Sequence, residues 1–126
     1  MKFISITLYN FSSFYTQHVI EFHTKPDYPI SIIVGGSGFG KTSIFDAINW
    51  ALYGREYESV LETQYQKNIL DYVNETALKE ALPKNNAVEM SSTLIFDHDD
   101  KRYRIQQAIC VLDNKGRLNI TDRTTS

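Results

Sequence analysis

Four glycines, a lysine and several hydroxyl side chains lie close together in the segment SIIVGGSGFGKTS, residues 31–43. Within it, Gly35, Gly40, Lys41 and Thr42 match the pattern G-x-x-x-x-G-K-[ST]. Glycines let backbone amides point inward with no Cβ in the way, lysine supplies a compact positive charge, and a threonine hydroxyl suits Mg²⁺. These residue types at this spacing predict a phosphate-binding loop, or P-loop.

Each residue of the predicted loop has an expected role. Lys41 is the candidate catalytic residue, because its charge stabilises the β- and γ-phosphates as negative charge moves during transfer. Thr42 is the candidate Mg²⁺ ligand, and Ser43 adds a hydrogen bond on the α-phosphate side. The candidate nucleotide-binding residues are Gly36, Ser37, Gly38, Phe39, Gly40, Lys41, Thr42 and Ser43. In the alternative interpretation, the glycines form only a flexible turn and Lys41 is solvated.

A strand and a helix must hold such a loop, and the sequence predicts both. Residues 30–34 (ISIIV) are nearly all apolar, as expected of a central strand covered on both faces. From Thr42 onward an apolar stripe with helical spacing predicts an amphipathic helix that stops at Gly54. The stripe consists of Ile44, Ala47, Ile48, Ala51 and Leu52. This context favours the phosphate-binding interpretation over the flexible turn.

The remaining elements follow from periodicity and turn residues. Residues 3–9 alternate as a half-buried strand, and a partner strand is expected at residues 19–22, after a loop. A second helix is predicted to start at Ser59, capped with Glu62, and to carry Leu61, Tyr65, Ile69 and Tyr72 on one face. A third helix is predicted at residues 74–82, closed by Pro83. Strands are then expected at 88–96 and 103–111 around the turn DHDD, followed by one more turn and a short strand.

Composition sets limits on the class of protein. The chain has 126 residues, enough for one domain, and a formal net charge of −2, which gives no global attraction to nucleic acid. Its single cysteine, Cys110, cannot form an internal disulfide, and no stretch resembles a secretory signal or approaches the ~18 apolar residues of a membrane span. We therefore expect a cytoplasmic protein with no membrane partner.

Two motifs carry a resemblance to a known family. The segment LYNFSSF (residues 8–14) precedes IIVGGSGFGKTSIFDAINWALYG (residues 32–54) by about twenty residues. Together they resemble the start of an ABC-type head in the SMC, SbcC and DNA-repair ATPase superfamily. Later residues resemble the antiparallel hairpin that follows in that superfamily. Among its members the chain looks most like DndD-type ATPases, which are linked to DNA phosphorothioation and phage restriction.

The chain departs from the family pattern at three positions. Ser12 stands where the family usually has Arg or Lys, Ser37 replaces a common Asn, and Phe39 replaces a small residue. The glutamine loop, the signature loop and the acidic pair that an ABC ATPase needs are not recognisable in the sequence. The resemblance therefore implies an α/β P-loop NTPase fold in which residues 1–126 form the N-terminal half of a head, with a mixed sheet and an antiparallel hairpin region.

The function implied is that of a DNA-associated ATPase whose ATP and Mg²⁺ site is completed by a second head in a homodimer. ATP hydrolysis would serve DNA repair, DNA processing or phage defence, with a nuclease or defence-system partner, and the segment alone would bind ATP without turnover. The alternative is a non-hydrolysing nucleotide-binding regulatory module, which the residues at positions 12 and 39 favour. A small P-loop kinase is a third option, but no acceptor site or lid is recognisable.

Other residues have simpler interpretations. Cys110 is expected to be a small buried side chain, and Trp50 to pack a helix on the sheet, whereas Tyr9 or Phe14 could instead stack on adenine. The histidines share no metal-ligand spacing. We expect DHDD to be a solvated turn, and Lys101, Arg102 and Arg104 to be a solvated hairpin face more readily than a DNA contact.

Overall fold

The computed structural model describes residues 1–25, 28–31 and 41–126, with side chains omitted for residues 23–31, 41 and 42. The predicted glycine-rich loop and residues 32–34 of the predicted central strand lie outside the described residues. Five strands form one sheet in the order β2-β1-β5-β6-β7. Their bounds are β1 Lys2–Phe11, β2 Phe14–Glu21, β5 Val88–His98, β6 Lys101–Asn114 and β7 Arg117–Thr125.

Every strand pairing in the described residues is antiparallel. Short turns join β1 to β2, β5 to β6 and β6 to β7, and such turns permit only antiparallel neighbours. The parallel pairing required by a mixed sheet is therefore not found in this part of the chain. The described part of the predicted central strand, β4 (Tyr28–Ser31), pairs with β3 (His23–Lys25) in a separate two-stranded sheet.

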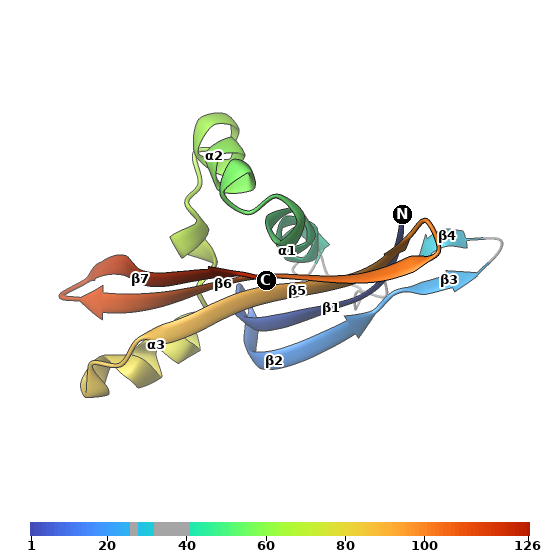
Figure 1. Cartoon of the computed structure of the whole chain (residues 1–126). Helices are drawn as coiled ribbons and strands as arrows, with labels where there is room; N and C mark the ends of the chain where they lie inside the picture. Colours follow the sequence, from blue (N-terminus) through green and yellow to red (C-terminus); the bar gives the residue numbers. More distant parts are fainter. Residues whose placement is uncertain (26–27, 32–40) are drawn as a thin grey trace.

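Helices cover both faces of the five-stranded sheet (Figure 1). α1 (Lys41–Tyr53) and α2 (Arg55–Gln64) stand above it in that view, and α3 (Glu75–Ala81) lies below. Two short 3₁₀ helices, η1 (Ile69–Tyr72) and η2 (Leu82–Lys84), flank α3 in sequence. The first helix confirms the predicted stripe, because Ile44, Ala47 and Ala51 are fully or almost fully buried.

The core lies between α1 and the upper face of the sheet. The alternation in β1 is confirmed, since Ile6 and Leu8 are completely buried and face α1 together with Met90, Leu94, Ile109 and Val111. Trp50 also packs as predicted, 1% exposed and with its ring 5.9 Å from that of Phe11. Two polar side chains complete this contact: Ser92 donates to the carbonyl of Ala47, and Gln107 donates to that of Ala51. The apolar stripe of α1 therefore fixes this helix on the sheet.

Two predictions for the second helix are wrong. α2 begins at Arg55 and not at Ser59. Gly54, with a φ of 54°, is the only residue between the end of α1 and the start of α2. α2 also ends at Gln64: Gln66 adopts a left-handed φ of 54° and the Lys67 amide donates to the Leu61 carbonyl, which closes the helix. Ile69 and Tyr72 therefore lie in η1 and not on a helical face shared with Leu61.

The remaining elements agree with the prediction except in length. β2 begins at Phe14, so that the expected loop shrinks to a turn at Ser12 and Ser13. Asn74 caps α3 through its side chain, and Pro83 follows in η2. Asp99 and Asp100 form the predicted hairpin turn, both with positive φ, as a two-residue turn between twisted strands requires.

Candidate nucleotide-binding site

The site is built around the first turns of α1. This helix starts at Lys41, directly after the glycine-rich segment, and Lys41 and Thr42 are its first two residues. The first amides of a helix have no intrahelical partner and carry partial positive charge, so this end attracts anions. Gly36, Ser37, Gly38, Phe39 and Gly40 lie outside the described residues, and the side chains of Lys41 and Thr42 are not described.

Ser43 is the first residue of the predicted loop whose side chain the structure describes. It is 9% exposed, and its hydroxyl lies 2.8 Å from the hydroxyl of Ser12. Ser12 belongs to the turn between β1 and β2, so this hydrogen bond joins the turn to the start of α1. The sequence did not reveal the contact, because the two residues are 31 positions apart. Ser12, the residue that departs from the family pattern, thus lies directly beside the predicted site.

Asp46 continues the site one turn further along α1. Its carboxylate is buried and accepts hydrogen bonds from the hydroxyls of Tyr57 in α2 and Tyr72 in η1, the latter at 2.8 Å. Burial and the hydrogen bond to Asp46 both raise the pKa of each tyrosine above its ordinary value. The two phenols therefore stay protonated at neutral pH and hold the carboxylate as donors.

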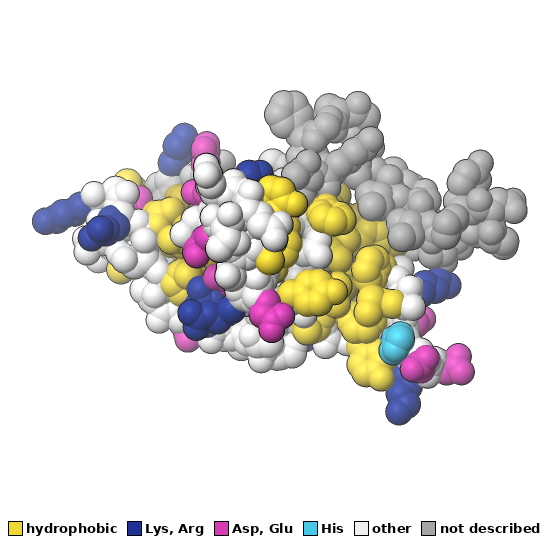
Figure 2. Space-filling view, turned by 90° about the horizontal axis from the view of Figure 1, so that it is seen from above, with side chains coloured by type: hydrophobic (Ala, Val, Ile, Leu, Met, Phe, Trp, Pro, Cys, Tyr) yellow, Lys and Arg dark blue, Asp and Glu magenta, His cyan; other side chains and the backbone are white. Residues whose placement is uncertain are grey.

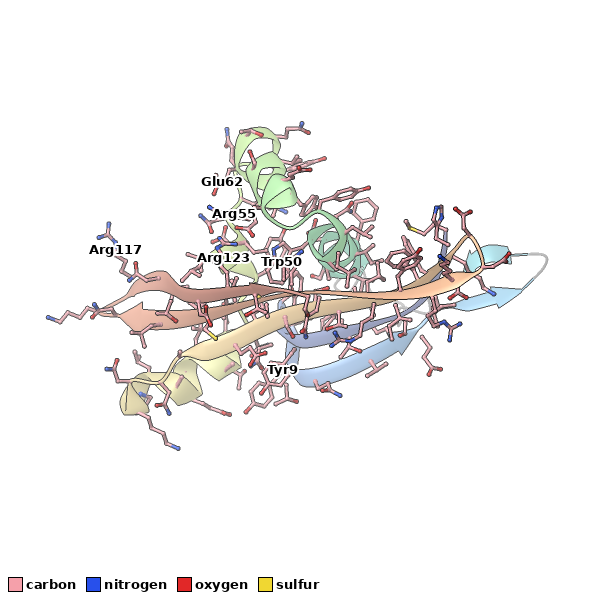
Figure 3. All side chains as sticks on the ribbon, viewed as in Figure 1. Tyr9, Trp50, Arg55, Glu62, Arg117 and Arg123 are labelled. Carbon is pink, nitrogen blue, oxygen red and sulfur yellow. The ribbon has the colours of Figure 1, made fainter. Side chains whose placement is uncertain are left out.

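A second buried acid ties the other end of α1 to the sheet. Glu58 in α2 accepts a hydrogen bond of 3.0 Å from the indole of Trp50 and two of 2.8 Å from the guanidinium of Arg123 in β7. Figure 3 shows Trp50 and Arg123 between the helices and the sheet. Burial raises the pKa of Glu58, but the bonds from Arg123 and Trp50 outweigh it and hold the pKa below its ordinary value. Glu58 is thus charged and paired.

An open groove of about 400 Å³ lies beside Ser12. The carboxylates of Asp71 and Glu75 are among its lining groups, so the groove repels anions. The Asp71 carboxylate also accepts a hydrogen bond from the backbone amide of Asn68, which caps η1. A phosphate group therefore suits the amino end of α1 and not this groove.

The structure also places the other residues that the sequence singled out. Arg102 pairs with Asp97 at 2.8 Å on the exposed hairpin, while Lys101 and Arg104 are exposed beside it. Cys110 is half-buried, and burial raises the pKa of its thiol, which does not favour a nucleophile. In the part of the chain that the structure describes, no three His, Cys, Asp or Glu side chains gather as metal ligands.

The pattern of one protein family, described as an AAA domain, matches residues 5–125 of the chain. The chain belongs to the AAA domain family. This membership places it among P-loop NTPases, as the motif predicted. None of the helices in the described residues is long and apolar enough to cross a membrane.

Two curated proteins are similar to this AAA domain over most of its length. The chain is 30% identical over 116 residues to the SbcC subunit of nuclease SbcCD from Treponema pallidum (strain Nichols), which is 91% of this chain and 10% of the relative. It is 27% identical over 113 residues to the SbcC subunit of the same nuclease from Bacillus subtilis (strain 168), or 87% of this chain and 10% of the relative. The resemblance to SbcC-type ATPases is confirmed, and the likeness to DndD stays a prediction. The chain spans about a tenth of the length of these curated relatives.

Proposed function

We propose that this AAA domain is the nucleotide-binding segment of an ATPase that processes DNA together with a nuclease. The observation that carries the proposal is the position of Lys41 and Thr42, which open α1 immediately after the glycine-rich segment. A helix start that follows a G-x-x-x-x-G-K-T sequence presents unpaired amides to a polyphosphate. The names of the two relatives, both subunits of a nuclease, supply the DNA-processing context.

The residues take the roles predicted from the sequence. The amides of residues 36–40 and the charge of Lys41 hold the phosphates of ATP, Thr42 binds Mg²⁺, and Ser43 contacts the α-phosphate side. Bound Mg²⁺ would neutralise charge on the phosphates. We propose that a second copy completes the site, so that the segment alone binds ATP without turnover. A role in phage defence and a cytoplasmic location belong to the same proposal.

ATP turnover by the full-length protein tests this function. We expect turnover that rises when duplex DNA is added, and a loss of about a hundredfold or more in the Lys41→Ala variant, because one transition-state donor is removed. Lys79→Ala is the matched control, since Lys79 lies exposed on α3. It should leave turnover unchanged.

Two other results would point elsewhere. ATP binding that depends on Lys41 but never leads to turnover, with or without DNA, would favour the non-hydrolysing regulatory module. Turnover that is equal in the wild type and Lys41→Ala would contradict any role for the predicted loop.

A further inference from the structure

The β1–β2 turn reaches the predicted site through a single side chain. The hydroxyl of Ser12 lies 2.8 Å from that of Ser43, and either oxygen can be the donor at this distance. A serine hydroxyl has one hydrogen to donate and two lone pairs to accept with. The direction of this hydrogen bond therefore decides whether the hydrogen of Ser43 is free for another partner.

The chain at the end of β1 and in the turn after it has unusual backbone angles. Asn10, near the end of β1, and Ser12, in the turn, have φ values of 51° and 55°, which residues other than glycine rarely adopt. Such strain persists only where surrounding contacts impose it, and it concentrates at functional sites. Contacts from the surrounding chain must therefore hold this turn.

Those contacts come from three parts of the chain. The Asn10 side chain donates to the carbonyl of Glu89 at 3.0 Å, the Ser12 amide donates to the carbonyl of Tyr72, and the Asn74 side chain donates to the carbonyl of Ser12 at 2.9 Å. Tyr72 in turn holds Asp46 on α1 through its hydroxyl. Ser12 and Tyr72 therefore brace the first two turns of α1 from the same place.

We propose that Ser12 is a positioning residue for the nucleotide, which donates to the Ser43 oxygen and so leaves the Ser43 hydrogen free for a phosphate oxygen. The inference rests on the proposed function. In the opposite direction the lone pairs of Ser43 would face the phosphate, and two acceptors repel each other. Ser12 is only half-buried, so that water can satisfy its own remaining acceptor sites.

Nucleotide affinity of the full-length protein tests the role of Ser12. The dissociation constants of ATP and ADP, each with Mg²⁺, are measured for the wild type, Ser12→Ala and Ser12→Gly. We expect both variants to weaken the binding of ATP and of ADP by the same factor, about fivefold, because the Ser43 hydroxyl is no longer held with its hydrogen toward the phosphate. Ser12→Gly relieves the strain at this φ, so a loss in both variants excludes a backbone effect. Ser13→Ala, in the same turn, is the matched control and should keep wild-type affinity.

A double-mutant cycle separates positioning from general damage. In a Ser43→Ala background, Ser12→Ala should have no further effect on affinity, since no hydroxyl remains to orient. Melting temperatures without nucleotide check that each variant is folded. Unchanged affinity in both Ser12 variants, or effects of Ser12→Ala and Ser43→Ala that add in full, would overturn the inference.

The failure of this inference differs from the failure of the proposed function. If the wild type and the Ser12→Ala variant bind ATP equally well and Lys41→Ala does not bind it, only the role of Ser12 is overturned. A wild type that binds no ATP, or a Lys41→Ala variant with full affinity, would overturn both.

Discussion

Asp46 is a buried carboxylate that depends on two tyrosines. Tyr57 and Tyr72 come from different elements, 11 and 26 positions further along the chain, and both hydroxyls donate to it. A buried carboxylate without donors costs far more free energy than one whose lone pairs are satisfied. The pair of tyrosines therefore sets how firmly α1 is fixed to α2 and η1.

The Tyr72→Phe variant should lower the free energy of unfolding by about 1–3 kcal/mol, because one oxygen of Asp46 is left buried without its donor. Denaturant unfolding at neutral pH measures the change. Tyr65→Phe is the control, since Tyr65 is exposed. Equal unfolding midpoints for the two variants would show that the contact between Tyr72 and Asp46 does not stabilise the fold.

At the scale of elements, Gly54 is the single residue between α1 and α2. Its φ is +54°, and a Cβ built on it would lie 3.0 Å from Nε2 of Gln107. Its amide also donates to the carbonyl of Trp50 at 2.7 Å, closing the last turn of α1. The junction therefore needs both a left-handed backbone and the absence of a side chain.

Gly54→Ala should destabilise the protein by about 2–3 kcal/mol, which combines backbone strain with a clash against Gln107. Gly116→Ala is the matched control: its φ is +84°, but nothing lies within 4 Å of the added Cβ. We expect Gly116→Ala to destabilise the protein by about 1 kcal/mol, from backbone strain alone. Thermal unfolding of both variants provides the measurement, and a larger loss in Gly116→Ala would contradict the role given to Gln107.

For the whole molecule, Glu58 joins residues from distant parts of the chain. Trp50 lies eight positions before it and Arg123 65 positions after it. The pairing ties α1 and α2 to β7, whose other basic residue, Arg117, lies at the far end of that strand from Arg123 (Figure 3). Glu58 thus connects α1 and α2 to an edge strand of the five-stranded sheet.

The link between Glu58 and Arg123 should depend on pH. The folded-state pKa of Glu58 lies below its ordinary value of 4.5. The stabilisation is therefore complete above pH 4.5 and is lost as pH falls through the lower folded-state pKa. The difference in unfolding free energy between the wild type and Glu58→Gln should be largest at neutral pH and shrink in acid. A difference that grows as pH falls would contradict this sign.

Arg123→Ala tests the same link from the other side. It should destabilise the protein at neutral pH by about 2 kcal/mol, since it leaves the Glu58 carboxylate without its cation. Arg117→Ala is the control, because Arg117 is exposed on the same strand. Unfolding curves for both variants show whether the loss belongs to the ion pair or to β7 in general.

The face of the molecule that carries α1 and α2 also has exposed apolar side chains (Figure 2). Phe45 and Tyr53, both on α1, are 64% and 56% exposed. They lie outside the buried stripe of the same helix, which faces the sheet. Exposed apolar side chains that gather on one face are typical of surfaces that contact another protein or domain.

The sequence by itself determined the local features whose causes lie within a few residues. Alternation in β1, the apolar stripe of α1, its end at Gly54, and the turn at Asp99 were all predicted, because each depends on neighbouring side chains or on one special φ. The P-loop motif and the two family segments likewise predicted a P-loop ATPase, because each motif is a short run of neighbouring residues. The start of α2 was predicted wrongly. Ser59 and Glu62 have the spacing of a capping box, but the helix already begins four residues earlier, after Gly54.

Only the tertiary structure decided which distant residues meet. The contacts of Ser12 with Ser43, of Tyr72 with Asp46, and of Arg123 with Glu58 join positions 31, 26 and 65 apart. No local pattern encodes such pairs, because they arise when β1, η1 and β7 are brought against α1 and α2 by burial of the shared core. The sequence therefore predicted the phosphate-binding loop, and the fold showed which residues hold the helix that follows it in place.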